Sequence, residues 1–341
     1  MTIPVQPVLD RRHRPLRDLR ISVTDRCNLR CRYCMPREHF GPGHRYLDAA
    51  DLLTFDDITR LARVFASLGV RKIRLTGGEP LLRRGIADLV ARLAATPGLD
   101  LAMTTNGLLL PTLAERLAEA GLRRVTVSLD SLDDTVFRAV ADTPVPVRRV
   151  LEGVDAAARA GLTPVKVNMV VKRGVNDGCV LPMAERFRGS GHILRFIEYM
   201  DVGATNEWQL GEVLTAAEIV RMIDDRHPLE PVSASHSGEV ATRYRYRDGA
   251  GEIGVIGSVT RPFCGDCTRA RLSADGKVHT CLFSSGGTDL RALLRAGASD
   301  EELGTAVRAI WDAREDGYSE LRGRRRTRSR EDRVEMSYIG G

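Results

Sequence analysis

VTDRCNLRCRYCMP, residues 23–36, is the stretch that decides the fold, because it places three thiols on one short loop. Cys27, Cys31 and Cys34 fall within eight residues, directly after a β-rich run at residues 19–23. In parallel α/β architectures, the loops that follow the carboxyl ends of the strands hold the ligands. We therefore expect the three thiols at the mouth of a parallel sheet.

Three cysteines are one ligand short of a closed metal site. A structural zinc site has four protein ligands, and His39 or His44 could supply the fourth one here. A cubane iron–sulfur cluster held by three cysteines instead leaves its fourth iron open to a non-protein ligand. The spacing by itself allows both interpretations.

Outward from this loop, β-rich runs alternate with amphipathic helical stretches. The further β-rich runs are residues 72–75, 101–104, 124–129, 164–171 and 193–199. Helical patterns between them include residues 56–68, with Thr54 as the N-cap and Gly69 after the end, and residues 111–120. Six βα-type units at the spacing of parallel crossovers predict an α/β fold.

Polar, glycine-rich motifs follow the first four predicted strands. They are TDRCN, TGGEP, TTNG and SLDS, in chain order. Glycine, asparagine and aspartate are also ordinary turn formers, but turn formation does not explain cysteines at such a position. Four consecutive strand ends of this kind predict one shared mouth.

The regular alternation of predicted strands and helices ends at about residue 201. Short β segments at residues 242–247 and 253–256, a hairpin around residues 275–276, and helical stretches at 289–295 and 301–314 predict a smaller C-terminal portion. This portion carries a second triplet, Cys264, Cys267 and Cys281, which also lacks a fourth ligand. The remaining cysteine, Cys179, stands beside apolar residues and is expected to pack as a small hydrophobe.

The composition bears on where the protein is located and on whether its cysteines bind metal or form disulfides. The 341 residues include no run near eighteen apolar positions and no apolar N-terminal stretch of signal length, which predicts a soluble, cytoplasmic protein. Seven cysteines in such a chain favour metal or redox chemistry over disulfides. The net charge of +6 has arginine clusters at residues 11–20 and 321–330, which suit either a solvated basic tail or an anionic ligand.

The first triplet also carries a resemblance. Cys-x3-Cys-x2-Cys with Tyr33 before the third cysteine, followed by GGEP after the next strand, resembles the signature of the radical S-adenosylmethionine enzymes. The resemblance implies a partial (β/α)6 barrel and a cluster whose open iron chelates the amino and carboxylate groups of S-adenosylmethionine. One electron from the cluster would then cleave the carbon–sulfur bond and generate a 5′-deoxyadenosyl radical.

A closer resemblance covers residues 16–341. The motifs already quoted, with KVNMVVKRGVND, RFIEYMDVG, FCGDCTRARLS and the terminal MSYIGG, are similar in kind and order to those of the GTP 3′,8-cyclase family of molybdenum cofactor biosynthesis. The implied reaction is cyclisation of GTP to (8S)-3′,8-cyclo-7,8-dihydro-GTP, through hydrogen abstraction at the ribose 3′ carbon and bond formation to guanine carbon 8. The implied fold is a partial (β/α)6 TIM-like barrel, residues 1–210, with a C-terminal α+β extension, residues 211–341, that closes the barrel mouth.

The same resemblance implies a set of site residues and cofactors. Two [4Fe–4S] clusters would be held by the triplets Cys27, Cys31, Cys34 and Cys264, Cys267, Cys281, the open iron of the second binding the guanine base. S-adenosylmethionine would contact Tyr33, Gly78, Ser128 and Met200. GTP would contact Arg20, Arg74, Thr104, Lys166, Arg195, Arg269, Ala270 and Arg271, and guanidinium groups suit phosphate because their planar fork donates two parallel hydrogen bonds. Arg269 and Arg271, and the tail Gly340 and Gly341 entering the barrel, would support catalysis.

The implied partners are GTP, an unidentified one-electron donor, and the next enzyme of the pathway, cyclic pyranopterin monophosphate synthase, by product hand-off. No membrane or nucleic acid is expected, and a homodimer is left open. Two other functions compete: a peptide-maturing radical enzyme with auxiliary clusters, which usually has more C-terminal cysteines, and a nucleic-acid-binding protein with two zinc knuckles. GGEP, the open triplets and an aromatic content of only 5% favour the cyclase over zinc knuckles.

Overall fold

The computed structural model describes residues 7–236, 238–322 and 333–340, and its centre is a curved parallel sheet. Six strands follow one another in chain order and are all parallel. They are β1 (Asp18–Ser22), β2 (Lys72–Thr76), β3 (Asp100–Thr105), β4 (Arg124–Ser128), β5 (Lys166–Val171) and β6 (Ile193–Glu198). The predicted α/β class and the predicted six-unit barrel are confirmed.

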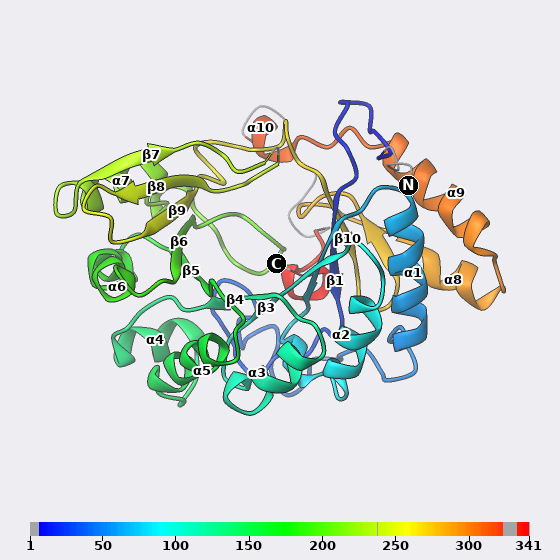
Figure 1. The fold of residues 1–341 in the computed structure, drawn as a ribbon, viewed down its shortest axis with the longest axis horizontal. Helices are drawn as coiled ribbons and strands as arrows, with labels where there is room; N and C mark the ends of the chain where they lie inside the picture. The colour runs from blue at the N-terminus through cyan, green and yellow to red at the C-terminus, as the bar shows by residue number, and fades with distance from the viewer. Residues whose placement is uncertain (1–6, 237, 323–332, 341) are drawn as a thin grey trace.

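Helices cover the outer side of this sheet, as Figure 1 shows. They are α1 (Phe55–Ser67), α2 (Ile86–Ala94), α3 (Leu110–Glu119), α4 (Asp134–Ala141), α5 (Arg148–Arg159) and α6 (Val180–Phe187), with short 3-10 turns η1 (Pro80–Leu82) and η2 (Asp177–Cys179). The predicted N-cap of α1 is confirmed, since Thr54 and Asp57 form a reciprocal capping box. Gly69 follows with a φ of 109°, which glycine adopts without steric cost.

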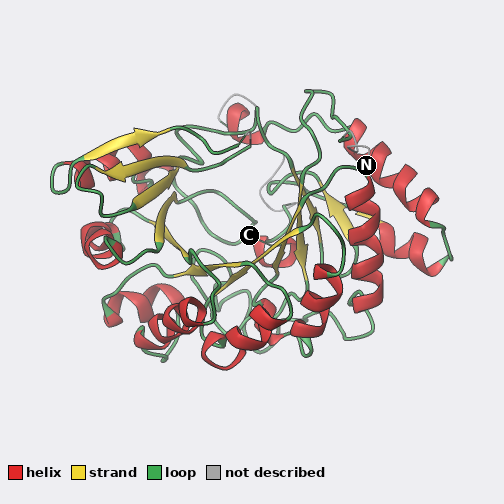
Figure 2. Ribbon diagram, in the orientation of Figure 1, coloured by secondary structure: helices red, strands yellow, loops and turns green. Residues whose placement is uncertain are grey.

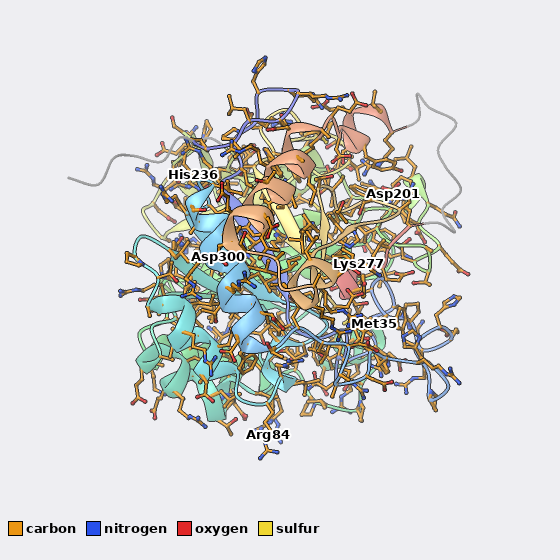
Figure 3. The ribbon with its side chains drawn as sticks, turned by 90° about the vertical axis from the view of Figure 1, so that its right-hand side faces the viewer. Met35, Arg84, Asp201, His236, Lys277 and Asp300 are labelled. Carbon is orange, nitrogen blue, oxygen red and sulfur yellow. The ribbon has the colours of Figure 1, made fainter. Side chains whose placement is uncertain are left out.

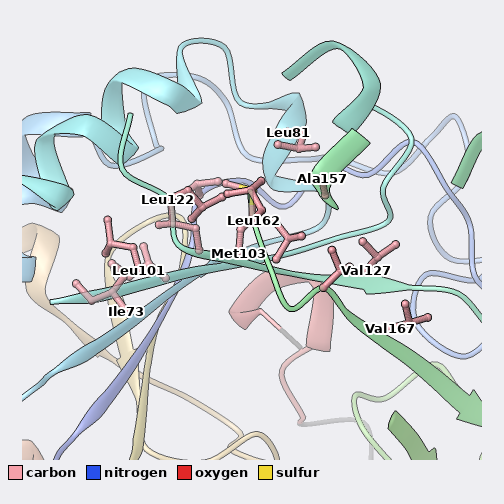
Figure 4. Close-up of a cluster of buried hydrophobic side chains, with 14 of the residues drawn as sticks. Ile73, Leu81, Leu101, Met103, Leu122, Val127, Ala157, Leu162 and Val167 are labelled. Carbon is pink, nitrogen blue, oxygen red and sulfur yellow. The ribbon is translucent and has the colours of Figure 1, made fainter. Parts of the chain in front are cut away.

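Alternation along the strands separates the core from the site. Apolar side chains such as Ile73, Met103 and Val127 are fully buried and pack beneath the helices (Figure 4). The residues between them in sequence, such as Arg74 and Thr104, face the concave side and line a cavity. A strand period of two therefore gives the sheet one apolar face and one polar face.

The C-terminal portion extends the sheet at both ends. Strand β9 (Glu252–Ile256) pairs parallel with β6, and β10 (Arg269–Leu272) pairs parallel with β1. Outside them lie β8 (Thr242–Tyr246) and β7 (Leu229–Val232) at one edge, and β11 (Lys277–His279) and β12 (Thr288–Asp289) at the other. The predicted hairpin joins β10 to β11. The extension thus flanks the barrel on both sides, and both its closure of the barrel mouth and the division at residue 210 stay predictions.

The last helices bring the end of the chain back to the barrel. The remaining elements are η3 (Leu210–Glu212), α7 (Ala216–Asp224), α8 (Leu290–Arg295), α9 (Asp300–Asp312), α10 (Tyr318–Leu321) and α11 (Met336–Ile339). Asp300, labelled in Figure 3, starts α9 beside α1 and accepts a hydrogen bond from Arg60 at 2.6 Å. The last described helix, α11, which is red in Figure 1, lies inside the curve of the strands, as Figure 2 also shows. Among the described residues, no helix has the length and apolar character that crossing a bilayer requires.

Candidate active site

A cavity of about 390 Å³ lies within the curve of the sheet. The four predicted strand-end motifs all contribute to its lining, through Cys27, Gly78, Asn106 and Ser128. The single shared mouth expected from the sequence is therefore confirmed. All six cysteines of the two triplets line the same cavity.

The two triplets lie at opposite ends of the strands. Cys27 follows the carboxyl end of β1, whereas Cys267 precedes the amino end of β10, which runs parallel to β1. Cys281 follows β11, whose antiparallel direction returns it to the amino end of β10. A molecule bound between the triplets would therefore span the length of the strands.

The first triplet is half-buried, in surroundings that disfavour free thiolates. Burial, then the nearby charge of Glu79, raises the pKa of Cys27 to about 11. Burial also raises the pKa of Cys31 and of Cys34. A bound metal deprotonates a coordinating thiol outright, so three thiols of raised pKa that line one cavity fit ligation of the iron ions of a cluster.

The GGEP motif brings two strand-end loops into close contact. A Cβ on Gly78 would lie 2.4 Å from the carbonyl oxygen of Arg26, so only glycine fits there. Glu79 is buried and accepts hydrogen bonds from Thr105 Oγ1 at 2.8 Å and from the Asn106 amide at 2.7 Å. Burial raises the pKa of Glu79 to about 7. This motif ties the β2 loop to the loops that follow β1 and β3.

The residues expected to bind S-adenosylmethionine come together at this end. Tyr33, Gly78, Ser128 and Met200 all line the cavity. The Tyr33 hydroxyl donates to Asp130 Oδ2 at 2.8 Å, and Asp130 Oδ1 accepts from the Val170 amide at 2.8 Å. Burial raises the pKa of Asp130 to about 6. Asp130 went unrecognised in the sequence because aspartate in SLDS also suits a turn.

Cations from neighbouring strands form a row in the middle of the cavity. Arg20 stands in register with Arg271 on one side and with Arg74 on the other. Burial, then the charges of Arg269 and Arg74, lowers the pKa of Arg20 to about 9. Like charges opposite one another on neighbouring strands are destabilising, so this row favours a polyanionic ligand.

Further expected GTP contacts join this row. Arg74 donates to Thr104 Oγ1 at 3.0 Å, and burial with the charge of Arg195 lowers its pKa to about 10. Burial lowers the pKa of Arg195 to about 10, and burial with the Arg195 charge lowers that of Lys166 to about 8. Lys72 also lines the cavity, in register with Asp18, and was not recognised in the sequence.

The second triplet lies among arginines. Burial raises the pKa of Cys281 to about 12. Burial would also raise the pKa of Cys267, but Arg269 and Arg314 lower it to about 7. Arg269 Nη2 donates to Cys267 Sγ at 3.2 Å, so Arg269 contacts a cysteine of the triplet as well as the cavity.

The C-terminal tail enters the barrel beside the cation row. The Arg271 guanidinium donates to the carbonyl oxygen of Gly340. Gly340 has a φ of 74°, and a Cβ there would lie 2.2 Å from Thr76 Cγ2. Met336 and Ser337 line the cavity. The entry of the tail is thus seen for Gly340, whereas Gly341 lies outside the described residues, as does the basic segment 323–332.

One buried carboxylate anchors this tail. Asp201 pairs with Arg322 at 2.8 Å and with Arg333 at 3.1 Å, and accepts a hydrogen bond from Tyr318. Further along, Glu335 accepts from the Ala204 amide at 3.0 Å. Asp201 follows Met200 directly, so the loop that carries an expected S-adenosylmethionine contact also holds the tail.

Some expected contacts are arranged differently. Ala270 does not belong to the cavity lining, since its side chain is 1% exposed and lies in the apolar core. His44 packs between the rings of Phe40 and Tyr46, at centroid distances of 4.7 and 4.6 Å. Across the described ranges, no three His, Cys, Asp or Glu side chains gather tightly enough for one metal ion. A cubane binds its thiolates through different irons and does not require such a tight group.

Comparison with known proteins places the chain among full-length relatives. A family model described as Radical SAM superfamily matches residues 21–187, and one described as Molybdenum Cofactor Synthesis C matches residues 192–320. A protein of Acidothermus cellulolyticus named GTP 3′,8-cyclase is 54% identical over 98% of this chain and 99% of its own length. One of the same name from Xanthomonas axonopodis pv. citri is 50% identical over all of both chains. A third, from Staphylococcus aureus, is 46% identical over 99% of this chain and all of its own.

Solved structures show the same fold at low sequence identity. Streptococcus suis SuiB bound to S-adenosylmethionine matches with a TM-score of 0.62 and 16% identity, over 94% of this chain and 72% of that chain. SuiB bound to its precursor peptide SuiA matches with a TM-score of 0.61 and 15% identity, over 94% and 71%. These likenesses show the fold alone, whereas the full-length relatives show the family.

Proposed function

The chain belongs to the GTP 3′,8-cyclase family of radical S-adenosylmethionine enzymes and cyclises GTP in molybdenum cofactor biosynthesis, and we propose how its residues divide that reaction between the two ends of the cavity. Cys27, Cys31 and Cys34 hold one [4Fe–4S] cluster at the carboxyl ends of the strands. Cys264, Cys267 and Cys281 hold another at the opposite end. When bound, the first cluster supplies the electron that cleaves S-adenosylmethionine, and the second supplies an open iron for the guanine base.

The observation that carries this proposal is the arginine row between the triplets. Arg271, Arg20 and Arg74 stand side by side on three neighbouring strands, inside a cavity that both triplets line. Such a row is costly in the absence of an anion, and a triphosphate neutralises it with charge-assisted hydrogen bonds. Lys166 and Arg195 extend the positive charge across β5 and β6. GTP would therefore lie with its phosphates on the row, its base at the second triplet and its ribose facing the first.

The groups at the other end suit S-adenosylmethionine. Gly78 lets the GGEP loop lie against the backbone of the loop that carries the first triplet, and Tyr33 is fixed by Asp130 beside that triplet. Ser128 and Met200 line the same cavity. We assign these residues to binding and orienting the methionine and adenine portions. A rigidly held cofactor restricts the substrate atoms from which the radical can abstract hydrogen.

The tail closes the cavity next to the phosphates. Arg271 bonds to Gly340, so this arginine is shared between the tail and the anion row. We assign Arg269, Arg271, Gly340 and Gly341 to supporting catalysis, through the orientation of GTP and the exclusion of water. The residues 1–210 then carry the radical chemistry, and 211–341 carry the second triplet and the tail.

The reaction needs partners outside the chain. Reductive cleavage of S-adenosylmethionine would consume one electron, so we propose an as yet unidentified one-electron donor as a partner. Product hand-off to cyclic pyranopterin monophosphate synthase follows from the place of the reaction in the pathway. A cytoplasmic location is in keeping with a nucleotide substrate and reduced cysteines. A second copy of this chain, in a homodimer, is a further proposed partner.

The proposal is tested by nucleotide binding to the anaerobically reconstituted enzyme. Isothermal titration with GTP and with ATP should give a preference for GTP in the parent enzyme. In Cys264→Ala, the preference should disappear while the triphosphate row still binds both nucleotides. An unchanged preference for GTP in Cys264→Ala would refute the assignment of the base to the second triplet. Iron analysis of the same samples should give about eight irons in the parent, since a cubane contains four.

A further inference from the structure

Two arginines from opposite ends of the chain meet behind the second triplet. Arg14 lies in the N-terminal arginine cluster at residues 11–20, which we call the leader, and Arg314 follows α9, 300 residues later. Their side chains are each 2% exposed, and both ion-pair with the fully buried carboxylate of Asp10, at 2.6 and 3.1 Å. Neither arginine belongs to the GTP row, so this buried network requires another explanation.

The guanidinium groups are directed at the backbone of the cysteine segments. Arg14 Nη1 donates to the carbonyl oxygen of Cys264 at 2.7 Å. Arg314 Nη1 donates to the carbonyl oxygen of Cys267 at 2.7 Å, and its Nε donates to that of Thr280, the residue before Cys281, at 3.1 Å. Two buried side chains thus hold all three segments that carry the second triplet.

One of these arginines also reaches a thiol. Arg314 Nη2 donates to Cys267 Sγ at 3.1 Å. Arg14 Nη2 is buried without a hydrogen-bond partner among the described residues, and Arg14 lines the cavity that the triplet lines. A buried donor without a partner costs free energy, and a negatively charged cluster beside it would remove that cost.

The network is held rigidly from behind. The Trp311 indole donates to the carbonyl oxygen of Arg14 at 3.0 Å, and its ring lies 4.5 Å from the Arg314 guanidinium. Asp10 accepts the backbone amides of Arg12 and Arg14, both at 2.9 Å. The leader turn is thereby fixed to the end of α9, which fixes the direction of both guanidinium groups.

We propose that Arg14 and Arg314 are positioning residues of the second cluster, which fix its three ligand segments and stabilise its reduced state by donating hydrogen bonds next to the thiolates. The proposal rests on the assignment of a cluster to the second triplet. Hydrogen bonds to the sulfurs raise the reduction potential of an iron–sulfur cluster, because they favour the more negative state. Part of the arginine-rich leader is thus buried beside the second cluster and is not a solvated basic segment.

The test isolates the second cluster in a full-length chain. A background with Cys27→Ala, Cys31→Ala and Cys34→Ala binds iron only at the second triplet, at about four irons per chain when reconstituted. Into this background are introduced Arg314→Gln and, as the matched control, Arg11→Gln. The Arg11 side chain is 63% exposed and pairs with Glu315 at 3.7 Å. Iron content and the midpoint potential from a spectroscopic redox titration are measured.

Arg314→Gln should lose at least half of the iron or, where it still loads, titrate at a lower midpoint potential than Arg11→Gln. Equal iron and equal potential in the two variants would overturn the proposal. If the background chain itself binds no iron, the assignment of the second cluster fails instead, so the two failures are distinguishable.

Folding is checked in the chain that keeps both triplets. Arg314→Gln should retain the first cluster and bind S-adenosylmethionine as the parent does. If it loses both clusters, Arg314→Lys decides the question, because lysine keeps the charge but lacks the fork that reaches several acceptors. Arg314→Lys should then load the second triplet only partly or at a lower potential, and a parental value for both would overturn the proposal.

Discussion

The guanidinium of Arg271 donates to the carbonyl oxygen of Gly340, 69 residues further along the chain. The same arginine stands in register with Arg20 on the neighbouring strand. One side chain therefore joins the end of the chain to the row of cations that we assign to the triphosphate.

Replacement of Gly340 by alanine should stop cyclisation without removing cofactors. A Cβ would lie 2.2 Å from Thr76 Cγ2, and the φ of 74° is unfavourable for alanine, so the tail must leave its place. We expect product formation to fall at least about a hundredfold, as misplacement of a positioning group can cost that much. Product and 5′-deoxyadenosine are measured by chromatography. Cyclisation at the parental rate in Gly340→Ala, or in a chain lacking Gly340 and Gly341, would show that the tail assignment is wrong.

Asp201→Asn should loosen the same tail from its other end. The substitution keeps the size of the side chain but removes the charge that holds Arg322 and Arg333. Hydrogen exchange of residues 333–340 should become faster and cyclisation slower, while the iron content stays parental. Asp248→Asn is the control, because its partner Arg188 forms a more exposed pair. Slow, parental exchange of the tail in Asp201→Asn would contradict an anchoring role.

GTP affinity should depend on pH through Lys166. Burial and neighbouring cations lower its pKa to about 8, so Lys166 is cationic below this pH and neutral above it. Raising the pH from 7 to 9 should weaken GTP binding by about tenfold, because a hydrogen bond to a charged group contributes about 1.5 kcal/mol. Lys166→Arg keeps its charge and serves as the control for titration of the nucleotide itself. The same pH dependence in both proteins would contradict a contact between Lys166 and the phosphates.

Arg20→Gln should stabilise the nucleotide-free protein and weaken its binding of GTP. Without GTP, Arg20 faces like charges on both sides, and its pKa is lowered by burial and then by the charges of Arg269 and Arg74. Removing it should raise the free energy of unfolding of the nucleotide-free protein by about 1 kcal/mol. Arg17→Gln, an exposed leader position, should change neither stability nor affinity. If Arg20→Gln destabilises the free protein, the row is not under repulsive strain.

Local patterns predicted most of the barrel. The strands appear within one or two residues of their predicted bounds, because alternation and turn residues act over a few positions. The Thr54 cap was equally readable, since capping depends on residues three positions apart. The loops with Cys27 and Gly78 could be placed at one mouth because parallel strands bring their carboxyl ends together.

Contacts between segments far apart in the sequence could not be predicted from such local patterns. Nothing in the local sequence indicates that β10 would pair with β1, or that β9 would pair with β6, since both pairings join residues far outside the reach of a local pattern, Asp18 with Arg269 and Leu194 with Ile253. The meeting of Arg14 with Arg314 depends on that arrangement, and each alone resembles a surface arginine. Asp201 likewise gains its role only from cations more than 100 residues away.

The most direct test of the two-ended cavity is the fate of S-adenosylmethionine and GTP in Cys264→Ala. The variant lacks one ligand of the second triplet and keeps the first triplet intact. After anaerobic reconstitution and reduction, it should bind S-adenosylmethionine as the parent does and form no 3′,8-cyclo-7,8-dihydro-GTP. Cyclisation of GTP at the parental rate by Cys264→Ala would contradict the account.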